Sequence, residues 1–389
     1  MSDRKGHNSI TEDGTATTLN AQEKERPLVS KTVVRRLTPL ECERLQGFPD
    51  FWTDIGEWTD GKGKKHKPAD SPRYKALGNS IAIPFWEWMA GRICEQYDRP
   101  VLLGSLFDGI GGFPLSFQAW GGRPVWASEI EPFPIAVTKL RFPGMEHLGD
   151  ITKLDGAQMP VVDVVTGGSP CQDLSVAGKR AGLAGERSGL FMEQVRVIKE
   201  MRREYARTCG TDLDVRPRYM VWENVPGAFS SNGGEDFRAV LEETARVCDQ
   251  DAVIPRPPGR WTPSGCIMGR GWSIAWRVHD AQFWGVPQSR KRIALVADFG
   301  GASAPEILFE REGLPGDSEP GRAEGQGTAE GAEGISGSAM SFQERAGKPV
   351  GGKGILLQPE RTGALSTLNN QSVCFQAKTE RRRQISGGG

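Results

Sequence analysis

The cysteine at position 171 has a setting that suits a chemically reactive thiol. It lies in the stretch VVTGGSPCQDLS (164–175), directly after an apolar β-branched run and a pair of glycines. A free cysteine is most often a small buried hydrophobic residue. In an open α/β sheet, however, a residue that follows a strand lies in the crevice where ligands bind. Cys171 is therefore a candidate nucleophile, provided that its surroundings lower the thiol pKa from its usual value of about 8.5.

Two other predicted strands carry polar residues at one end. RYMVWENV (218–225) ends near Glu223, and QSRKRIALVA (288–297) begins with Arg290 and Arg292. A thiol and a carboxylic acid together suit attack on an electron-poor ring, with the acid protonating a ring nitrogen. Residues two apart lie on one side of a strand, so both guanidinium groups could orient a carboxylate, a phosphate or a base carbonyl. The alternative is that these charges are only solvated strand ends.

A glycine-rich turn predicts a site for a nucleoside. DGIGGF (108–113) follows a predicted strand and opens a predicted helix, where glycines let a ligand approach free backbone N–H groups. Glu129 ends the next predicted strand, twenty-one residues after Asp108, and a carboxylate there can accept from ribose hydroxyls. Asp150 follows the third apolar stretch and can accept from an amino group. Acidic side chains at this site favour a nucleoside over a phosphate.

These residues need a sheet that brings the ends of successive strands together. From residue 100 the sequence alternates apolar strand patterns, glycine turns and amphipathic helices, which predicts an α/β fold with a doubly wound, mostly parallel sheet. Before it, Thr38, Pro39 and Glu41 form a capping-box pattern that predicts a helix ending at Gly47. Residues 301–340 are rich in Gly, Ala, Glu, Ser and Pro, which predicts a flexible segment.

Composition excludes several classes of protein. Lys plus Arg equals Asp plus Glu, 49 each, so net charge does not indicate a polyanionic partner. The basic clusters KGKKHK (62–67), RKR (290–292) and RRR (381–383) are each more typical of a solvated surface than of a contact. The seven cysteines form no CxxC pair, which argues against a disulfide framework or a zinc site. With no apolar signal or membrane-spanning stretch, we expect a cytoplasmic protein with no membrane partner and no metal.

Four fragments in this order resemble the DNA cytosine-5 methyltransferases. They are SLFDGIGGF, GGSPCQDLS, WENV and QSRKRIALVA, and RRLTPLECERLQGFPD and YKALGNSIAIP resemble that family's two remaining signature blocks. The resemblance covers roughly residues 33–300 and implies a Rossmann-like fold that binds S-adenosylmethionine, with S-adenosylhomocysteine as product. It implies that Phe107 packs on the adenine, that Glu129 holds the ribose and that Asp150 holds the adenine amino group. The remaining residues implied for the cofactor are Gly109, Gly111, Gly112, Ile130, Pro170, Asn79 and Ser80.

The same resemblance assigns the chemistry. Cys171 would add to C6 of a cytosine, Glu223 would protonate N3, and Arg290 and Arg292 would position the base and the cysteine loop. The target base would be flipped out of duplex DNA, which costs about a few kcal/mol. The glycine-rich loop 173–189 resembles the loop that closes over the flipped base. The residues expected to contact DNA are Gln172, Ser175, Lys179, Arg180 and Arg187.

Two features depart from the family's pattern. Ile130 stands where an aromatic residue is frequent, although an aliphatic side chain can also pack on adenine. The order of the blocks is the larger departure. RRLTPLECERLQGFPD and YKALGNSIAIP normally follow the other four blocks but here precede them, so the chain resembles a circular permutation. GALSTLNNQ (363–371) matches GTATTLNAQ (14–22) at five of nine positions. We therefore expect a catalytic domain over 31–300 and a target-recognition domain formed by 301–389 together with 1–30.

The predicted function is site-specific methylation of C5 of cytosine in double-stranded DNA. An RNA cytosine methyltransferase of the same fold is the nearest alternative, and the long, divergent recognition region favours DNA. A non-catalytic DNA-binding relative is the alternative of another class, but it would be expected to lack Cys171 or Glu223. The resemblance implies a protein of prokaryotic or phage-encoded type, and we expect a monomer with a cognate restriction endonuclease as a further partner.

Overall fold

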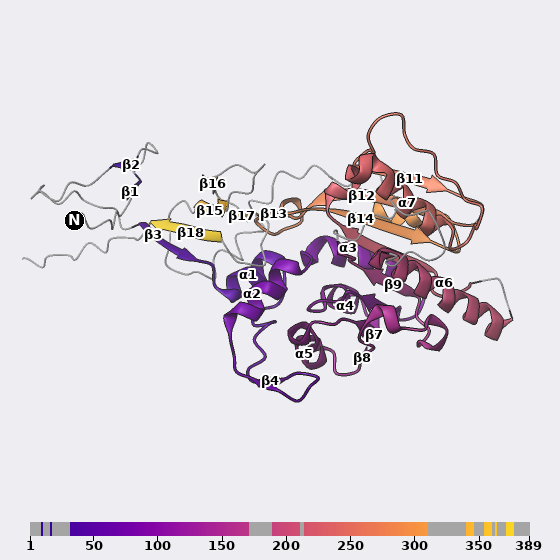
Figure 1. Ribbon diagram of the computed structural model, residues 1–389, viewed down its shortest axis with the longest axis horizontal. Coiled ribbons are helices and arrows are strands. Elements are labelled where there is room, and N and C mark those ends of the chain that lie inside the picture. Colours follow the sequence, from indigo (N-terminus) through magenta and orange to yellow (C-terminus); the bar gives the residue numbers. More distant parts are fainter. Residues whose placement is uncertain are drawn as a thin grey trace, which may run out of the picture.

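The eight-stranded sheet at the centre of the molecule positions the candidate residues. The structure is a computed structural model that describes residues 32–170, 189–210 and 214–309, with side chains from residue 36, and the backbone of short strands near both ends of the sequence. The strand order is β11-β12-β14-β10-β9-β6-β7-β8 (Figure 1). The strands are β6 (Leu102–Leu106), β7 (Arg123–Ser128), β8 (Glu146–His147), β9 (Val164–Gly167), β10 (Tyr219–Asn224), β11 (Ser264–Met268), β12 (Ser273–Asp280) and β14 (Lys291–Asp298).

The order of the parallel strands reverses beside β6. The chain runs from β6 to β7 and β8 on one side, and then returns to β9 and β10 on the other, all parallel. Strands β14, β12 and β11 continue the sheet in antiparallel pairs. The predicted doubly wound α/β sheet is thus confirmed, whereas the antiparallel edge was not predicted. Ligands bind where the strand order reverses, which here is between the carboxyl ends of β6 and β9.

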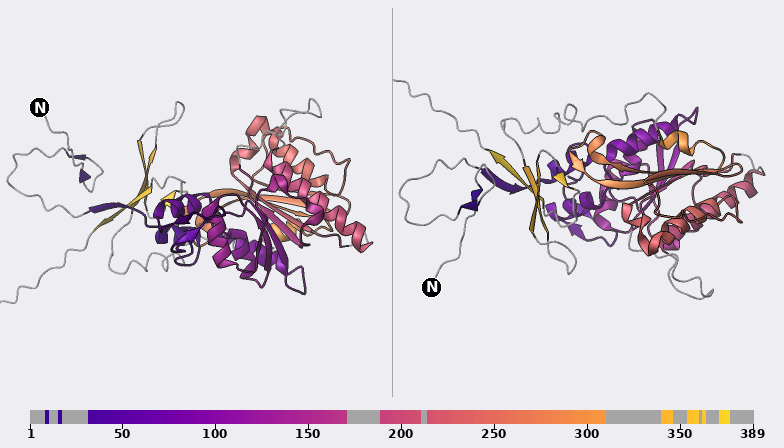
Figure 2. Two further views of the ribbon diagram at one scale, coloured as in Figure 1. Left: turned by 60° about the horizontal axis from the view of Figure 1, so that its bottom comes forward. Right: turned by 90° about the horizontal axis from the view of Figure 1, so that it is seen from above.

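Helices cover both faces because the strand residues alternate between two cores. Val164 and Val221 face one core, whereas Val165 and Trp222 face the other. Figure 2 shows helices on both sides of the sheet. The first core includes α3 (Ile83–Cys94), α4 (Gly112–Gln118) and α5 (Pro132–Arg141), and the second includes α6 (Leu190–Cys209) and α7 (Glu235–Ala245).

Three helices that precede the sheet in sequence complete its first face. They are α1 (Pro39–Gln46), α2 (Asp70–Asn79) and α3. The predicted capping box is present, since Thr38 accepts from the backbone N–H of Glu41 and the Glu41 carboxylate accepts from that of Thr38. Helix α3 packs across α4, where Trp86 and Phe113 meet edge to face with ring centroids 5.2 Å apart. None of the described helices is both long and apolar enough to cross a membrane.

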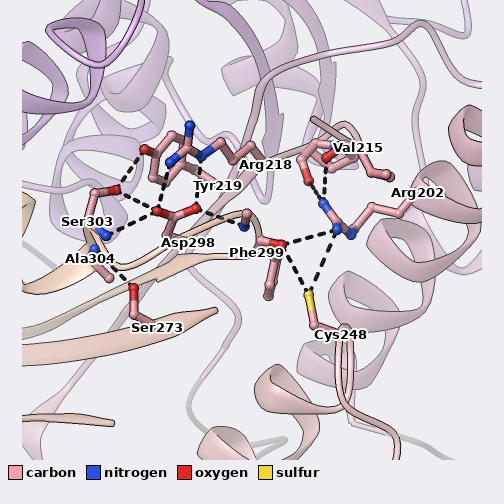
Figure 3. Close-up of polar contacts among 12 residues, drawn as sticks. Arg202, Val215, Arg218, Tyr219, Cys248, Ser273, Asp298, Phe299, Ser303 and Ala304 are labelled. Atoms are coloured by element: carbon pink, nitrogen blue, oxygen red, sulfur yellow. Dashed lines mark hydrogen bonds and ion pairs between the residues drawn. The ribbon is translucent and has the colours of Figure 1, made fainter. Parts of the chain in front are cut away.

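A short helix corrects the predicted boundary at residue 300. Helix α8 (Ala304–Leu308) buries Ala304, Ile307 and Leu308 in the first core, so the packed unit extends beyond the point where the flexible segment was expected. Its start is fixed by polar contacts at the end of β14 (Figure 3). Asp298 accepts from the Ser303 hydroxyl (2.6 Å) and from Arg218 (2.9 Å). The composition resembled a linker, but positions 304, 307 and 308 lie on one helical face.

Strands from the two ends of the sequence share a second sheet. Its order is β16-β15-β18-β3, and it contains β3 (Thr32–Arg36), β15 (Met340–Arg345), β16 (Gly354–Pro359) and β18 (Gln371–Gln376). Strand β3 pairs antiparallel with β18. Both figures place these strands beside α1 and α2, apart from the eight-stranded sheet. Strand β17 (Thr362–Gly363) pairs with β13 (Gln288–Ser289), which directly precedes Arg290.

Candidate active site

The backbone that leads to Cys171 is fastened to the end of strand β10. The Asn224 side-chain amide donates to the carbonyl of Ser169 (3.0 Å), and the Trp222 indole N–H donates to the Ser169 hydroxyl (3.0 Å). Ser169 and Asn224 are buried, and Trp222 is fully buried. Because Trp222 and Asn224 flank Glu223, the strand end holds the cysteine loop's first residues and the carboxylate together.

Glu223 and Arg292 form an ion pair beside this backbone. The Arg292 Nε atom lies 2.8 Å from Glu223 Oε1, and both side chains are largely buried, with 17% of the arginine and 14% of the glutamate surface exposed. The other carboxylate oxygen of Glu223 lies 3.0 Å from where a Cβ on Gly168 would stand. A side chain at position 168 would therefore crowd the carboxylate. The structure brings three of the predicted elements together: the strand end before Cys171, the acid and one arginine.

The cysteine itself lies outside the described residues. So do the predicted DNA contacts of the following loop, which are Gln172, Ser175, Lys179, Arg180 and Arg187. Pro170, the last described residue before Cys171, is exposed.

The glycine turn after β6 has the geometry of a ligand loop. Phe107 adopts a left-handed backbone (φ 54°), which is rare for an aromatic residue and typical of functional sites. Gly109 is also left-handed (φ 57°), and a Cβ there would meet nothing within 4 Å, so a ligand can approach its backbone. Gly111 (φ 81°) is N-terminal to α4, and a Cβ on it would lie 2.6 Å from Phe142. The turn is therefore open on its ligand side and tightly packed behind.

Glu129 holds this turn through its own carboxylate. Oε2 accepts from the backbone N–H of Gly109 (2.8 Å), and Oε1 accepts from those of Ile130 (2.7 Å) and Glu131 (2.9 Å). A carboxylate has about four acceptor positions, so these three bonds leave about one position for a ribose hydroxyl. Ile130 is 69% exposed beside it, which gives an apolar surface at the rim of the turn.

The position of Asp150 does not by itself indicate a ligand. Its Oδ1 atom accepts from the backbone N–H (3.0 Å) and hydroxyl (2.8 Å) of Thr152, so it caps the short helix Ile151–Lys153. These hydrogen bonds hold its pKa below the usual value. It is therefore a charged acceptor near the end of β8, and its contact with an adenine amino group stays a prediction.

The segment 78–80 is held against the site by Arg290. The buried guanidinium donates to the carbonyls of Gly78 (3.2 Å) and Ser80 (2.6 Å). Burial lowers the pKa of Arg290 to about 9, with the charge of Arg292 acting in the same direction. Ser80 is buried and Asn79 is exposed. Arg290 thus positions the predicted cofactor segment, a role that the sequence did not indicate, whereas its predicted contact with the base stays untested.

Two residues at the site were not predicted from sequence. Asp108 is 5% exposed, and its Oδ1 accepts from the Ser105 hydroxyl (2.6 Å), while Oδ2 is buried and has no hydrogen-bond partner in the part of the chain that the structure describes. Burial raises its pKa to about 8. The Trp52 indole donates to the carbonyl of Ile110 (2.8 Å) and so supports the glycine turn from the α1 side. The sequence did contain a signal for Asp108, which is the acid inside the glycine turn. The Trp52 contact spans 58 residues and has no local signal in the sequence.

Together these residues fit a nucleoside ligand rather than a phosphate. The turn has an open left-handed glycine, a strained aromatic residue, an exposed aliphatic rim and a carboxylate acceptor. Within residues 36–170, 189–210 and 214–309, no group of three or more His, Cys, Asp and Glu side chains could hold a metal ion.

Comparison with known proteins finds similar sequences. A family described as "C-5 cytosine-specific DNA methylase" matches residues 2–95 and 102–247. The type II methyltransferase M.MspI of Moraxella sp. is 30% identical over 204 residues, 52% of this chain and 40% of that protein. A protein of Escherichia phage P1 named DNA N-6-adenine-methyltransferase is 34% identical over 252 residues, 58% of this chain and 32% of that protein.

One solved structure also aligns with about half of this chain. The S. pombe Dnmt2 methyltransferase structure aligns with 55% of this chain and 52% of that chain, at 21% identity and a TM-score of 0.34. This chain spans between a third and about two fifths of the length of the first curated relatives it matches.

Proposed function

Because the chain belongs to the C-5 cytosine-specific DNA methylase family, we propose that it methylates C5 of a specific cytosine in double-stranded DNA. The proposal includes a covalent step through Cys171. The observation that carries it is the junction of Ser169, Glu223 and Arg292, because it places a carboxylate directly beside the backbone that leads to the thiol.

S-adenosylmethionine is the proposed cofactor, and the residues present fit it. When bound, it supplies an electrophilic methyl group, and S-adenosylhomocysteine remains after transfer. Glu129 would hold the ribose hydroxyls, and Phe107 and Ile130 would flank the adenine. The backbone of Gly109 to Gly112 would approach the ligand, and Asn79, Ser80 and Pro170 would line the rest of the site.

The chain's own residues would activate the base. The Cys171 thiolate forms a bond to C6 of the flipped cytosine while Glu223 gives its proton to N3, so the electron pair of the C5–C6 double bond becomes available at C5. After C5 has gained its methyl group, a water molecule takes the C5 proton and the C5–C6 double bond re-forms. The C6–S bond breaks to release the Cys171 thiolate, and N3 returns its proton to Glu223. Arg292 orients Glu223 for this exchange, since its Nε atom already fixes one carboxylate oxygen.

Nucleoside analysis tests the proposed product. The chain would be incubated with S-adenosylmethionine and either plasmid DNA or transfer RNA, and the digested nucleosides measured by mass spectrometry. We expect 5-methylcytosine in DNA and none with Cys171→Ala. N6-methyladenine as the product, or methylation of RNA alone, would overturn the proposal.

A mechanism-based trap tests the covalent step. An oligonucleotide with 5-fluorocytosine at the target should form a denaturant-resistant adduct, because fluorine cannot leave C5 as a proton does. Cys266→Ala is the matched control, since this exposed cysteine lies at the far edge of the sheet. The adduct should persist in Cys266→Ala and vanish in Cys171→Ala, and the reverse would refute the assignment.

Two further proposals concern the domain organisation of the chain and the partners of the protein. We propose that the strands from both ends of the sequence, β3, β15, β16 and β18, belong to one target-recognition unit. We also propose that the protein is a cytoplasmic monomer and that a cognate restriction endonuclease is its partner.

A further inference from the structure

A short hairpin between α1 and α2 carries a dense group of lysines. Strands β4 (Trp58–Thr59) and β5 (Lys65–His66) pair antiparallel, and Figure 1 shows this lysine hairpin, residues 58–67, projecting from the body of the molecule below α2. Its four lysines are Lys62, Lys64, Lys65 and Lys67, and all are exposed. None forms an ion pair with another described residue. Four unpaired cations within six positions create a strong local positive field in a chain of zero net charge.

The hairpin's one acid is used to fix its shape. Asp60 Oδ1 accepts from the backbone N–H groups of Lys62 (2.9 Å) and Lys64 (3.0 Å), and its Oδ2 atom lies 2.9 Å from His66 Nε2. The His66 ring stacks on Trp58, with centroids 4.1 Å apart and planes 9° from parallel. The hydrogen bond from His66 holds the pKa of Asp60 below its usual value. The lysines are thus presented from a preorganised turn, and Asp60 faces inward.

The base of the hairpin is attached to the elements that form the active site. Trp58 meets Phe133 of α5 edge to face at 5.6 Å, and Phe133 lies four residues after Glu129. Just beyond the hairpin, Lys75 of α2 pairs with Glu131 (3.0 Å), and α2 ends at Asn79. The hairpin therefore lies at the carboxyl edge of the parallel strands, the same edge as Gly168 and Glu223.

We propose that the lysine hairpin binds the phosphate backbone of duplex DNA beside the target base. The inference rests on the proposed function. DNA carries a negative charge about every 1.7 Å of helix axis, so a duplex that delivers a base to this edge also brings flanking phosphates past it. Lysine ammonium groups on a fixed turn position a duplex without reading its sequence. The hairpin thus supplies affinity and register, and leaves sequence recognition to other parts of the chain.

A salt titration of DNA binding tests the proposal. Wild type, Lys64→Gln/Lys65→Gln and Arg260→Gln/Arg270→Gln would each bind a labelled duplex at salt concentrations from about 50 to about 200 mM, followed by fluorescence anisotropy. Both variants remove two exposed positive charges, and Arg260 and Arg270 flank β11, the outermost strand at the other end of the strand order from β7 and β8. We expect the lysine variant to lower the slope of log affinity against log salt by about 0.9 for every phosphate that no longer has a lysine beside it. The arginine variant should keep the wild-type slope.

The outcomes separate this inference from the proposed function. Equal slopes for the two variants, with methylation intact, would overturn the hairpin assignment and leave the proposed activity standing. A reduced slope for the lysine variant, in a chain that produces no 5-methylcytosine, would support the hairpin and refute the activity. Loss of binding to duplex RNA but not to duplex DNA would assign the hairpin to another partner and overturn the proposal. S-adenosylmethionine affinity should be equal in all three proteins.

Discussion

Arg292 and Glu223 join the ends of two antiparallel strands, with Nε and Oε1 2.8 Å apart. Their pairing means that the predicted acid is oriented before any substrate arrives. It also means that the two side chains act as a unit, so their contributions to catalysis should not be additive.

The first prediction follows from this pair. Glu223→Gln keeps the shape of the side chain but removes its ionisable proton, and should lower kcat by about 10²–10⁴-fold. Arg292→Met should also lower kcat, while the double variant should be little worse than Glu223→Gln alone. Single-turnover methylation with S-adenosylmethionine affinity measured in parallel checks this. Losses that multiply in the double variant would show that the two residues act independently.

The second prediction concerns the buried carboxyl of Asp108, which should make stability depend on pH. In the unfolded chain this group loses its proton near pH 4, whereas in the fold its pKa is about 8. Folding therefore takes up a proton between these values, and this group's contribution to stability falls as pH rises from about 4 to about 8. Asp108→Asn should remove the effect. It should match wild type near pH 4 and be more stable by roughly 5 kcal/mol near pH 8, because a pKa displaced by one unit corresponds to about 1.4 kcal/mol.

Urea unfolding at several pH values measures this difference. Asp98→Asn is the control, because it removes a carboxyl at an exposed position near the opposite end of the sheet. An Asp108→Asn variant that parallels wild type across the whole range would contradict the prediction. A variant that gains stability only at acidic pH would contradict its sign.

Arg290 carries the third prediction, which separates its two candidate roles. Arg290→Lys cannot bridge the carbonyls of Gly78 and Ser80, so the cofactor segment should loosen. Hydrogen bonds to a charged group are worth about 1.5–3 kcal/mol, so S-adenosylmethionine affinity should fall about ten- to a hundredfold. Calorimetry without DNA measures this directly. An unchanged cofactor affinity with a raised KM for DNA would instead assign Arg290 to the base.

The sequence allowed the elements with local signals to be predicted. The strands that end at Leu106, Gly167 and Asn224 each combine an apolar run with a glycine or polar end, and the cap at Thr38 follows a short-range pattern. The antiparallel strand β11 has no such signal, because its residues alternate between half-buried and exposed around a single partner strand. Helix α8 was hidden by a composition typical of linkers.

The same distinction between local and long-range signals holds for the residues of the site. Glu223 and Glu129 were predictable because each ends a strand, and parallel strand ends meet at one edge. The contacts that hold the site together join residues far apart in sequence. Arg290 reaches Ser80 across 210 positions, and no periodicity or motif records such a contact.

The fourth prediction concerns the sheet formed by the two ends of the sequence. Strand β18 lies between β15 and β3, whereas β3 is at the edge, so a proline disrupts more pairing in β18 than in β3. Val373→Pro should abolish site-specific methylation, and Val34→Pro, which lies opposite the neighbouring residue Cys374, should impair it less. Both variants should retain S-adenosylmethionine affinity, because none of the residues proposed to bind the cofactor lies in this sheet. Bisulfite sequencing of a co-expressed plasmid reports the modified site, and calorimetry reports the cofactor. Wild-type methylation at the same site in Val373→Pro, or in a deletion of 355–389, would show that target recognition lies elsewhere in the chain.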